Sequence, residues 1–183
     1  LAAFLFGFRA AGLWSDEAGT NLLDTGAPFY DTYEIADGKF MSVGAIEPQF
    51  YAKLLEGLGL DASQMPHQYD RDAWPKTAAR FTEMFKTRTR DEWAAIFDGT
   101  DACVAPILSL SEAPDHPPNR ARGTFIHAVA GQIAPQAAPR LSRTPGSAGA
   151  EAPLPGAHTE EVLRAAGLTA EETRALATDG VAG

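Results

Sequence analysis

Residues 30–43 have the pattern of a β-hairpin, which joins two neighbouring segments into one sheet. Apolar and polar residues mostly alternate over Tyr30–Ile35, as in a strand with one buried face. Asp37-Gly38 then supplies a dipeptide that favours tight hairpin turns. Lys39–Val43 is the expected return strand, so the first part of the chain is predicted to contain a sheet.

Segments with helical periodicity follow the hairpin. Glu47-Pro48 opens the first, because proline fits the first helical turn, where its missing N–H would have no helical partner. Trp74–Lys86 and Asp91–Phe97 repeat the pattern, and Thr100–Ile107 is predicted to be a buried strand. The apolar positions of the first two helices are Phe50, Leu54, Leu55, Leu58, Ala78, Phe81 and Phe85.

The two ends of the chain differ from this middle part. Leu1–Trp14 is rich in Ala, Leu and Phe with no strong polar face, which predicts a helix that needs a partner. Prolines interrupt the chain from Pro114 onward, and Gln132–Pro155 has little periodicity, so we expect an irregular surface segment there. Helices are predicted again from Thr159 and from Thr169, which are capping-type residues followed by acids.

Charge and composition argue against several functional classes. The 183 residues carry a net charge of −9 at pH 7 and a pI near 4.8, whereas nucleic-acid and anionic-membrane surfaces need clustered Lys and Arg. The same excess of acidic residues also disfavours binding of a polyanionic ligand such as CoA. With 45% hydrophobic residues, however, the chain is able to bury a core.

The single cysteine indicates the cellular compartment, and the first residues indicate where the chain begins. Cys103 cannot form an internal disulfide, which favours a reducing compartment and a cytoplasmic location; we expect it to be a small buried side chain. The apolar run Leu1–Phe8 is cut by Arg9, far short of the ~20 residues needed to span a bilayer. Because the chain begins without methionine inside an expected helix, we expect its upstream part to be missing.

The signatures of common cofactors are absent from the sequence. There is no phosphate-binding glycine loop, no dinucleotide fingerprint and no pair of Cys or His at metal-ligand spacing, so we expect neither a metal nor a separate cofactor. The four histidines are scattered. Asp115-His116 is expected in an exposed, Pro-rich loop without a catalytic role, and Asp98–Asp101 is expected to be a turn.

Glu47 is the most interesting polar residue of the sequence. It lies between an apolar strand end, Val43–Ile46, and the helix that begins at Pro48, a place where a carboxylate can be held beside N–H dipoles at the mouth of a cleft. From the local pattern alone, a plain capping acid is the favoured interpretation, because charged residues at helix starts are common and mostly structural. The role of Tyr30 is also undecided from the sequence, since its position fits either the core or a pocket wall.

Several motifs of this chain resemble the α-methylacyl-CoA racemases of the family III CoA-transferase superfamily. The most specific is Ala-Ile-Glu-Pro-Gln-Phe at residues 45–50, followed by Asn-Leu-Leu-Asp-Thr-Gly-Ala-Pro-Phe-Tyr at 21–30. Ala36–Gly38, Phe97–Pro106 and His158–Glu161 extend the match over nearly the whole chain. One departure is Thr25, where the family usually has glycine; a positive φ there would strain threonine.

The resemblance implies an enzyme that removes the proton α to a thioester carbonyl, forms a planar enolate and returns a proton to either face. Two opposed acid/base groups are required for this chemistry. In the family they are a histidine, associated with a glutamate, and an aspartate. The glutamate matches Glu47, which would orient or charge-stabilise the histidine. The histidine and aspartate belong to a region upstream of Leu1, so this chain alone is expected to be inactive.

The resemblance also implies a substrate surface and binding partners. Leu23, Tyr30 and Ile46 match positions near the apolar acyl-binding surface of the family. CoA is part of the acyl-CoA substrate, and its basic contacts lie mainly upstream. The expected setting is lipid metabolism, in branched-chain or sterol side-chain degradation.

The fold class implied is α+β: the small domain and C-terminal segment of a two-domain fold whose chains interlock as a homodimer. Residues 1–28 would be the linker helix and loop, 29–118 the small domain, and 119–183 the return to the large domain. The apolar start of the chain then predicts poor solubility in isolation.

Two other interpretations remain open. A family III CoA-transferase would move CoA between carboxylic acids through an aspartyl thioester, again with its nucleophile upstream. A non-catalytic fragment would only dimerise or bind a partner. The upstream histidine and aspartate motifs would distinguish a racemase from a transferase.

Overall fold

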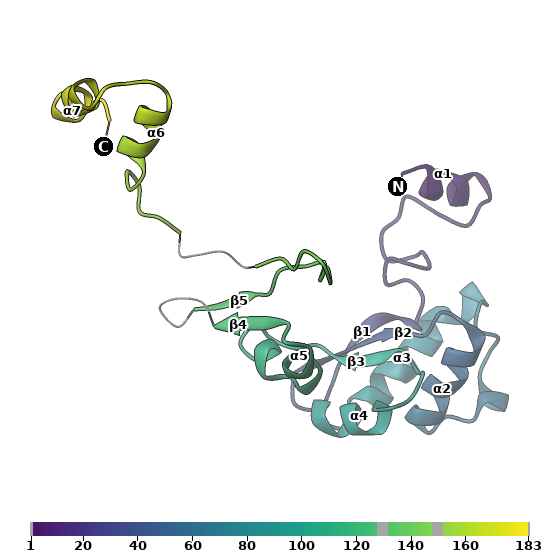
Figure 1. Ribbon diagram of the computed structural model, residues 1–183. Helices are drawn as coiled ribbons and strands as arrows, with labels where there is room; N and C mark the ends of the chain where they lie inside the picture. Colours follow the sequence, from purple (N-terminus) through teal and green to yellow (C-terminus); the bar gives the residue numbers. More distant parts are fainter. Residues whose placement is uncertain (1, 128–131, 148–151, 183) are drawn as a thin grey trace. The chain divides into compact units, whose positions relative to one another are not determined.

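A computed structural model describes residues 2–127, 132–147 and 152–182. The chain forms two compact units, residues 1–108 and 109–183, which are coloured purple to teal and teal to yellow (Figure 1). No helix within the described ranges is long and apolar enough to cross a membrane. The domain ranges implied by the resemblance stay predictions.

The first unit is built on a three-stranded antiparallel sheet in the order β1-β2-β3. β1 (Tyr30–Glu34) and β2 (Phe40–Gly44) form the predicted hairpin, and Gly38 supplies the left-handed turn residue at φ 73°. β3 is shorter than the predicted buried strand and spans only Val104–Pro106. It lies at an edge with Ala105 exposed, so the expectation of a fully buried strand was wrong.

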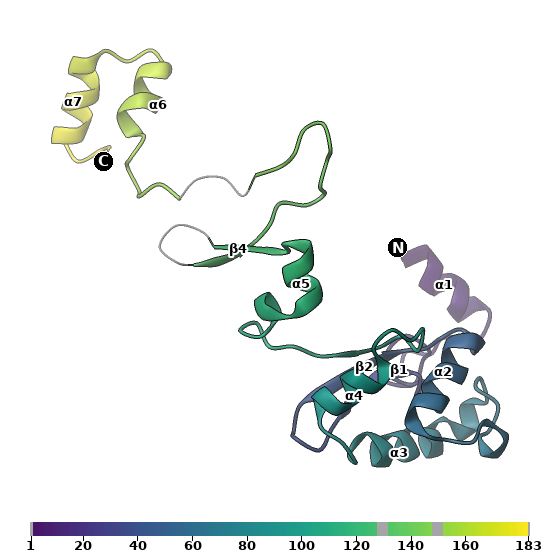
Figure 2. The same ribbon diagram turned by 60° about the horizontal axis from the view of Figure 1, so that its bottom comes forward.

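Three helices lie on the same side of this sheet: α2 (Pro48–Leu58), α3 (Trp74–Phe85) and α4 (Arg90–Phe97), as Figure 2 shows. All three were predicted to within one or two residues. Their apolar faces meet alternate residues of the strands, because side chains of a strand point to opposite faces in turn. The buried cluster includes Phe29, Tyr33, Met41, Val43, Leu54, Leu58, Phe81, Phe85, Trp93 and Phe97.

Local interactions fix the ends of these helices. Pro48 occupies the first turn of α2, and Gly59 ends it in the left-handed conformation at φ 70°. Thr89 and Glu92 form a reciprocal capping box at the start of α4. Trp93, on the buried face of α4, donates its indole N–H to the Phe85 carbonyl oxygen at 2.8 Å, which ties α4 to the end of α3.

The segment before the sheet contains a helix and a hydrogen-bonded loop. α1 (Ala2–Ala10) confirms the predicted N-terminal helix within the described residues, and none of those residues is buried. In the loop, the amide of buried Asn21 donates to the carboxylate of Asp24 at 2.6 Å and to the Ser15 carbonyl at 3.2 Å. Thr25 has φ 72°, so the strain expected at this departure from glycine is present.

The second unit consists of short elements. η3 (Ala113–Asp115) and α5 (Pro117–Arg122) are followed by the antiparallel strands β4 (Phe125–His127) and β5 (Ile133–Pro135). β5 corrects the expectation of an irregular segment only at residues 133–135; residues 136–147 and 152–155 contain no helix or strand, as expected, and residues 148–151 lie outside the described ranges. The two predicted terminal helices are confirmed as α6 (Thr159–Ala165) and α7 (Ala170–Thr178).

Candidate active site

Glu47 occupies the junction between the sheet and α2. It is the residue before the first helical turn, with φ −74° and ψ 145°, and its side chain makes no capping hydrogen bond. Its carbonyl oxygen, in contrast, accepts from the backbone N–H groups of Phe50 and Tyr51 at 3.0 and 2.9 Å. The plain capping interpretation of the carboxylate therefore does not apply, and this exposed carboxylate remains accessible to another group.

The backbone that carries Glu47 is held by two side chains from a distant loop. The amide of Gln68 donates to the carbonyl oxygens of Ala45 and Ile46 at 3.1 and 2.7 Å. The Tyr69 hydroxyl donates to the same Ile46 carbonyl at 2.6 Å. Gln68 is only 8% exposed, whereas Tyr69 is 42% exposed, so the Gln68 bonds are the ones shielded from water. Together the bonds hold the backbone that leads into Glu47. We call Gln68 and Tyr69 the carbonyl clamp.

The carbonyl clamp was not found by sequence reasoning. Its residues follow the carbonyls they hold by more than twenty positions, in a loop without periodicity. Residue types gave no usable signal, because an amide next to an aromatic residue is an ordinary loop composition. Trp74 anchors the clamp in turn, because its indole N–H donates to the Gln68 carbonyl at 2.9 Å.

Cys103 faces the same end of the sheet as Glu47. Its carbonyl oxygen accepts from the Gly44 N–H at 2.9 Å. Burial, followed by the negative charges of Glu47 and Asp101, raises the pKa of the Cys103 thiol. The residue itself is exposed, which contradicts the expected buried side chain. Its backbone, at φ 52°, leaves the regular strand path and explains why the side chain does not enter the core.

The three predicted acyl-contacting residues have different environments. Tyr30 begins β1 opposite Gly44 and is 37% exposed, so its ring is not part of the core. Ile46 directly precedes Glu47 and is half-buried, and Leu23 is half-buried in the loop before the sheet. Neither belongs to the buried cluster or packs against it, whereas neighbouring Leu22 does. The structure thus brings Tyr30, Ile46 and Glu47 to one end of the sheet, with Leu23 in the preceding loop.

A second acid lies near this end of the sheet. Asp31 follows Tyr30 on β1, opposite Val43. Burial raises the pKa of Asp31, although the Thr32 N–H donates to its carboxylate at 2.7 Å and opposes that change. Sequence reasoning assigned Asp31 no role.

Glu47 supplies an accessible carboxylate, but the described residues around it do not form a complete proton-transfer apparatus. No ion pair joins Glu47 to a histidine within the described ranges, and no group of three potential metal ligands occurs there. A single carboxylate in this position can orient a base or stabilise its charged form. It cannot by itself serve both faces of a planar intermediate.

Comparison with known proteins identifies the family. CoA-transferase family III matches residues 7–159. α-Methylacyl-CoA racemase of Mus musculus is 48% identical over 182 residues, and that of Homo sapiens is 44% identical over 182 residues; each match covers 99% of this chain and 48% of the racemase. The chain thus spans about half the length of these relatives.

Solved structures share the fold. A CaiB/BaiF family protein from Brucella suis has a TM-score of 0.60 at 21% identity, covering 91% of this chain and 44% of that one. A mutant of Rv3272 from Mycobacterium tuberculosis has a TM-score of 0.57 at 13% identity, covering 86% and 42%. The family match and the racemase relatives together establish that this α+β chain belongs to CoA-transferase family III.

Proposed function

We propose that the full-length protein is a 2-methylacyl-CoA racemase and that Glu47 positions its proton-transfer base. The observation that carries this proposal is the exposed Glu47 carboxylate, which makes no cap and sits on a backbone held by the carbonyl clamp. Identity of 44–48% to two α-methylacyl-CoA racemases over nearly the whole chain supports the reaction class.

The reaction removes the proton α to the thioester carbonyl, so that the electron pair moves into an enolate and the α-carbon becomes planar. Return of a proton to the opposite face inverts the centre. Glu47 contributes by accepting a hydrogen bond from a histidine supplied by the rest of the protein, which favours the tautomer and charge state needed for transfer. Glu47 is a positioning residue in this scheme, and the 183-residue chain alone is inactive.

Two side chains at this end of the sheet and one in the preceding loop bind the acyl group. Leu23, Tyr30 and Ile46 are partly exposed and lie outside the core cluster, so they can contact a branched acyl chain without disturbing the fold. Their lack of charge allows the chain to slide between two proton-transfer positions. CoA enters as part of the substrate, the protein acts as a homodimer in the cytoplasm, and its role lies in lipid metabolism.

CoA transfer between carboxylic acids is the second candidate. It is favoured by the match to CoA-transferase family III and by 34% identity over 110 residues, 58% of this chain and 30% of the relative, to a CaiB/baiF CoA-transferase family protein of Caenorhabditis elegans. A transferase forms an aspartyl thioester and needs no exchange of the α-proton. Measuring exchange of the α-proton and trapping the aspartyl thioester therefore distinguish a racemase from a CoA-transferase.

Hydrogen–deuterium exchange at the α-carbon of a 2-methylacyl-CoA tests the proposal directly. We expect the full-length protein to incorporate solvent deuterium and Glu47→Gln to lower the exchange rate about 100-fold, as for loss of a group that supports acid–base catalysis. Glu56→Gln is the matched control, because Glu56 is an exposed acid on α2 that pairs with Lys53. Equal rates in the wild type and Glu47→Gln would remove Glu47 from the site. No exchange in the wild type, with a trapped acyl-enzyme, would favour the transferase.

A further inference from the structure

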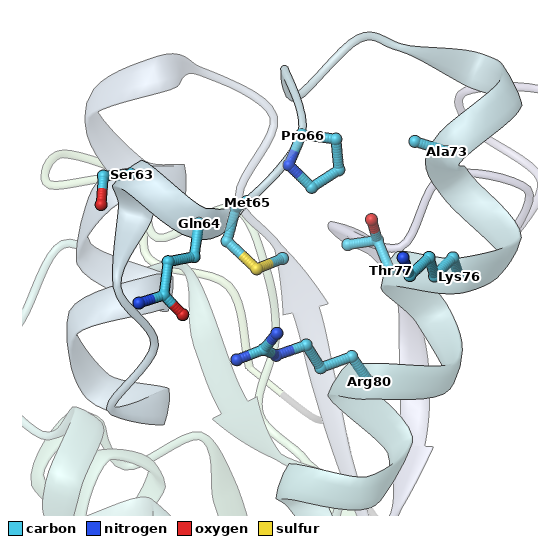
Figure 3. Close-up of a pocket in the computed structure, with 8 residues that line it drawn as sticks. All are labelled: Ser63, Gln64, Met65, Pro66, Ala73, Lys76, Thr77 and Arg80. Atoms are coloured by element: carbon cyan, nitrogen blue, oxygen red, sulfur yellow. The ribbon is translucent and has the colours of Figure 1, made fainter.

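A pocket away from Glu47 lies between the loop of residues 63–66 and helix α3. Its volume is about 460 Å³. One wall is the loop and the other is a face of α3, from which Lys76 and Arg80 extend toward the loop (Figure 3). Gln64 and Met65 project from the loop side. The remaining lining residues are Ser63, Pro66, Ala73 and Thr77.

Two cations without counter-charges define the electrostatics of this pocket. Lys76 and Arg80 are four residues apart, so they share one face of α3, where like charges repel. Within the described ranges neither forms an ion pair or a hydrogen bond. No carboxylate lines the pocket. The nearest acid in the loop, Asp61, already accepts from the Ser63 hydroxyl at 2.7 Å.

The side chain of Thr77 lies on the same wall. Thr77 is only 4% exposed, and its hydroxyl has no hydrogen bond to any described residue. Thr82 on the same helix behaves differently, because its hydroxyl donates to the Ala78 carbonyl at 2.9 Å. Thr77 lines the pocket, and its hydroxyl is not one of the enclosed side-chain atoms without a partner among the described residues, so a ligand oxygen in the pocket can reach it.

We propose that this pocket binds the phosphate group of a small ligand. Lys76 and Arg80 supply two positive charges for a dianion, and the Thr77 hydroxyl donates a further hydrogen bond. Phosphate fits this set better than a carboxylate, because its additional oxygens allow Arg, Lys and a hydroxyl to bind at once. The apolar groups of Met65, Pro66 and Ala73 contact the part of the ligand that carries the phosphate. The site is independent of the proposed racemase reaction.

Isothermal titration of the 183-residue chain with inorganic phosphate at constant ionic strength tests the site. We expect saturable binding in the millimolar range, weakened about tenfold by Lys76→Gln or Arg80→Gln, as for loss of one charge-assisted contact. Lys86→Gln is the matched control, since Lys86 follows the same helix but does not line the pocket. Absence of saturable binding, or equal loss in the control, would overturn the proposal.

The Thr77 hydroxyl is tested by a pair of variants. Thr77→Val removes the hydroxyl while keeping the shape, and Thr77→Ser keeps the hydroxyl. We expect weaker phosphate binding in the first and near-normal binding in the second, with folding of both checked by tryptophan fluorescence. Equal affinity of the two folded variants would contradict the assigned contact.

Two further ligands identify the source of the phosphate. Adenosine 3′,5′-bisphosphate binding more tightly than inorganic phosphate, with the same loss in Arg80→Gln, would support a nucleotide phosphate as the occupant. Equal affinities would support free phosphate. Acetate binding as well as phosphate would overturn the preference for phosphate over carboxylate.

Discussion

The two units of this chain are stabilised in different ways. In residues 1–108, three helices bury aromatic side chains such as Phe81 and Trp93 against a sheet. In residues 109–183, Thr173 is the single buried residue within the described ranges, and Leu110 is 94% exposed. The comparison shows that regular elements form in both units, although among the described residues only the first unit has a shared apolar core to hold them together.

Truncation of a large apolar side chain should give the largest difference in stability loss between the two units. Phe81 is fully buried, so Phe81→Ala removes apolar burial and leaves a cavity, with an expected loss of about 3–5 kcal/mol in the free energy of unfolding. Leu110→Ala in the second unit should change it by less than about 0.5 kcal/mol. Urea denaturation measures both, followed by tryptophan fluorescence for the first unit, which holds Trp14, Trp74 and Trp93, and by far-UV circular dichroism for the second. A similar loss in the two variants would break the distinction.

The carbonyl clamp should contribute a smaller share of the first unit's stability. Gln68→Leu preserves volume but leaves the Ala45 carbonyl without its side-chain donor, and we expect a loss of about 2 kcal/mol. Gln49→Leu, on the exposed side of α2, controls for the change in side-chain type. If the urea denaturation curves of the two variants coincide, the clamp has no structural role.

The two capping boxes allow the same substitution to be compared across units. Thr89→Ala and Thr169→Ala each remove a side chain that accepts from the N–H of a glutamate three residues on, at a cost of about 1 kcal/mol. In α4 we expect the cost in global unfolding, because Trp93 ties that helix to the core. In α7 we expect it only as faster local amide hydrogen exchange. Global loss from Thr169→Ala would indicate that the second unit is more cooperative than its burial suggests.

The smallest expected effect is electrostatic and lies at the candidate site. The Cys103 pKa is raised by burial and then by the charges of Glu47 and Asp101, so Glu47→Gln should lower that pKa. The pH profile of Cys103 alkylation would then shift toward lower pH. Glu34→Gln, in β1 and not among the groups that shift this pKa, is the control. An unchanged profile would show that the Glu47 carboxylate does not face the thiol.

Elements that depend on local periodicity were predictable from the sequence. Asp37-Gly38 located the hairpin, and the spacing of Leu54, Leu58, Phe81 and Phe85 located the buried faces of α2 and α3. β4 and β5 were missed, because three-residue strands are too short for alternation to be recognised. The short length of these two strands, and not an unusual composition, prevented their prediction.

The candidate site was only partly predictable, for a different physical reason. Glu47 was found because its motif is contiguous in the sequence. The groups that position its backbone, Gln68 and Tyr69, act through hydrogen bonds across more than twenty residues. The exposure of Cys103 follows from its positive φ. The types of the neighbouring residues did not predict this backbone angle. Long-range bonds and unusual backbone angles are thus the parts of the site that a structure had to supply.

The carbonyl clamp fixes the backbone before Glu47 independently of the side chains that the clamped residues carry. Gln68 and Tyr69 bind main-chain oxygens of residues 45 and 46, so the bonds do not depend on which side chains these residues carry. Ile46 can therefore be exchanged for smaller or larger apolar residues while Glu47 keeps its place. In the proposed racemase, acyl-chain preference would thus be separable from the position of Glu47, and the acyl-contacting residues could vary without moving that carboxylate.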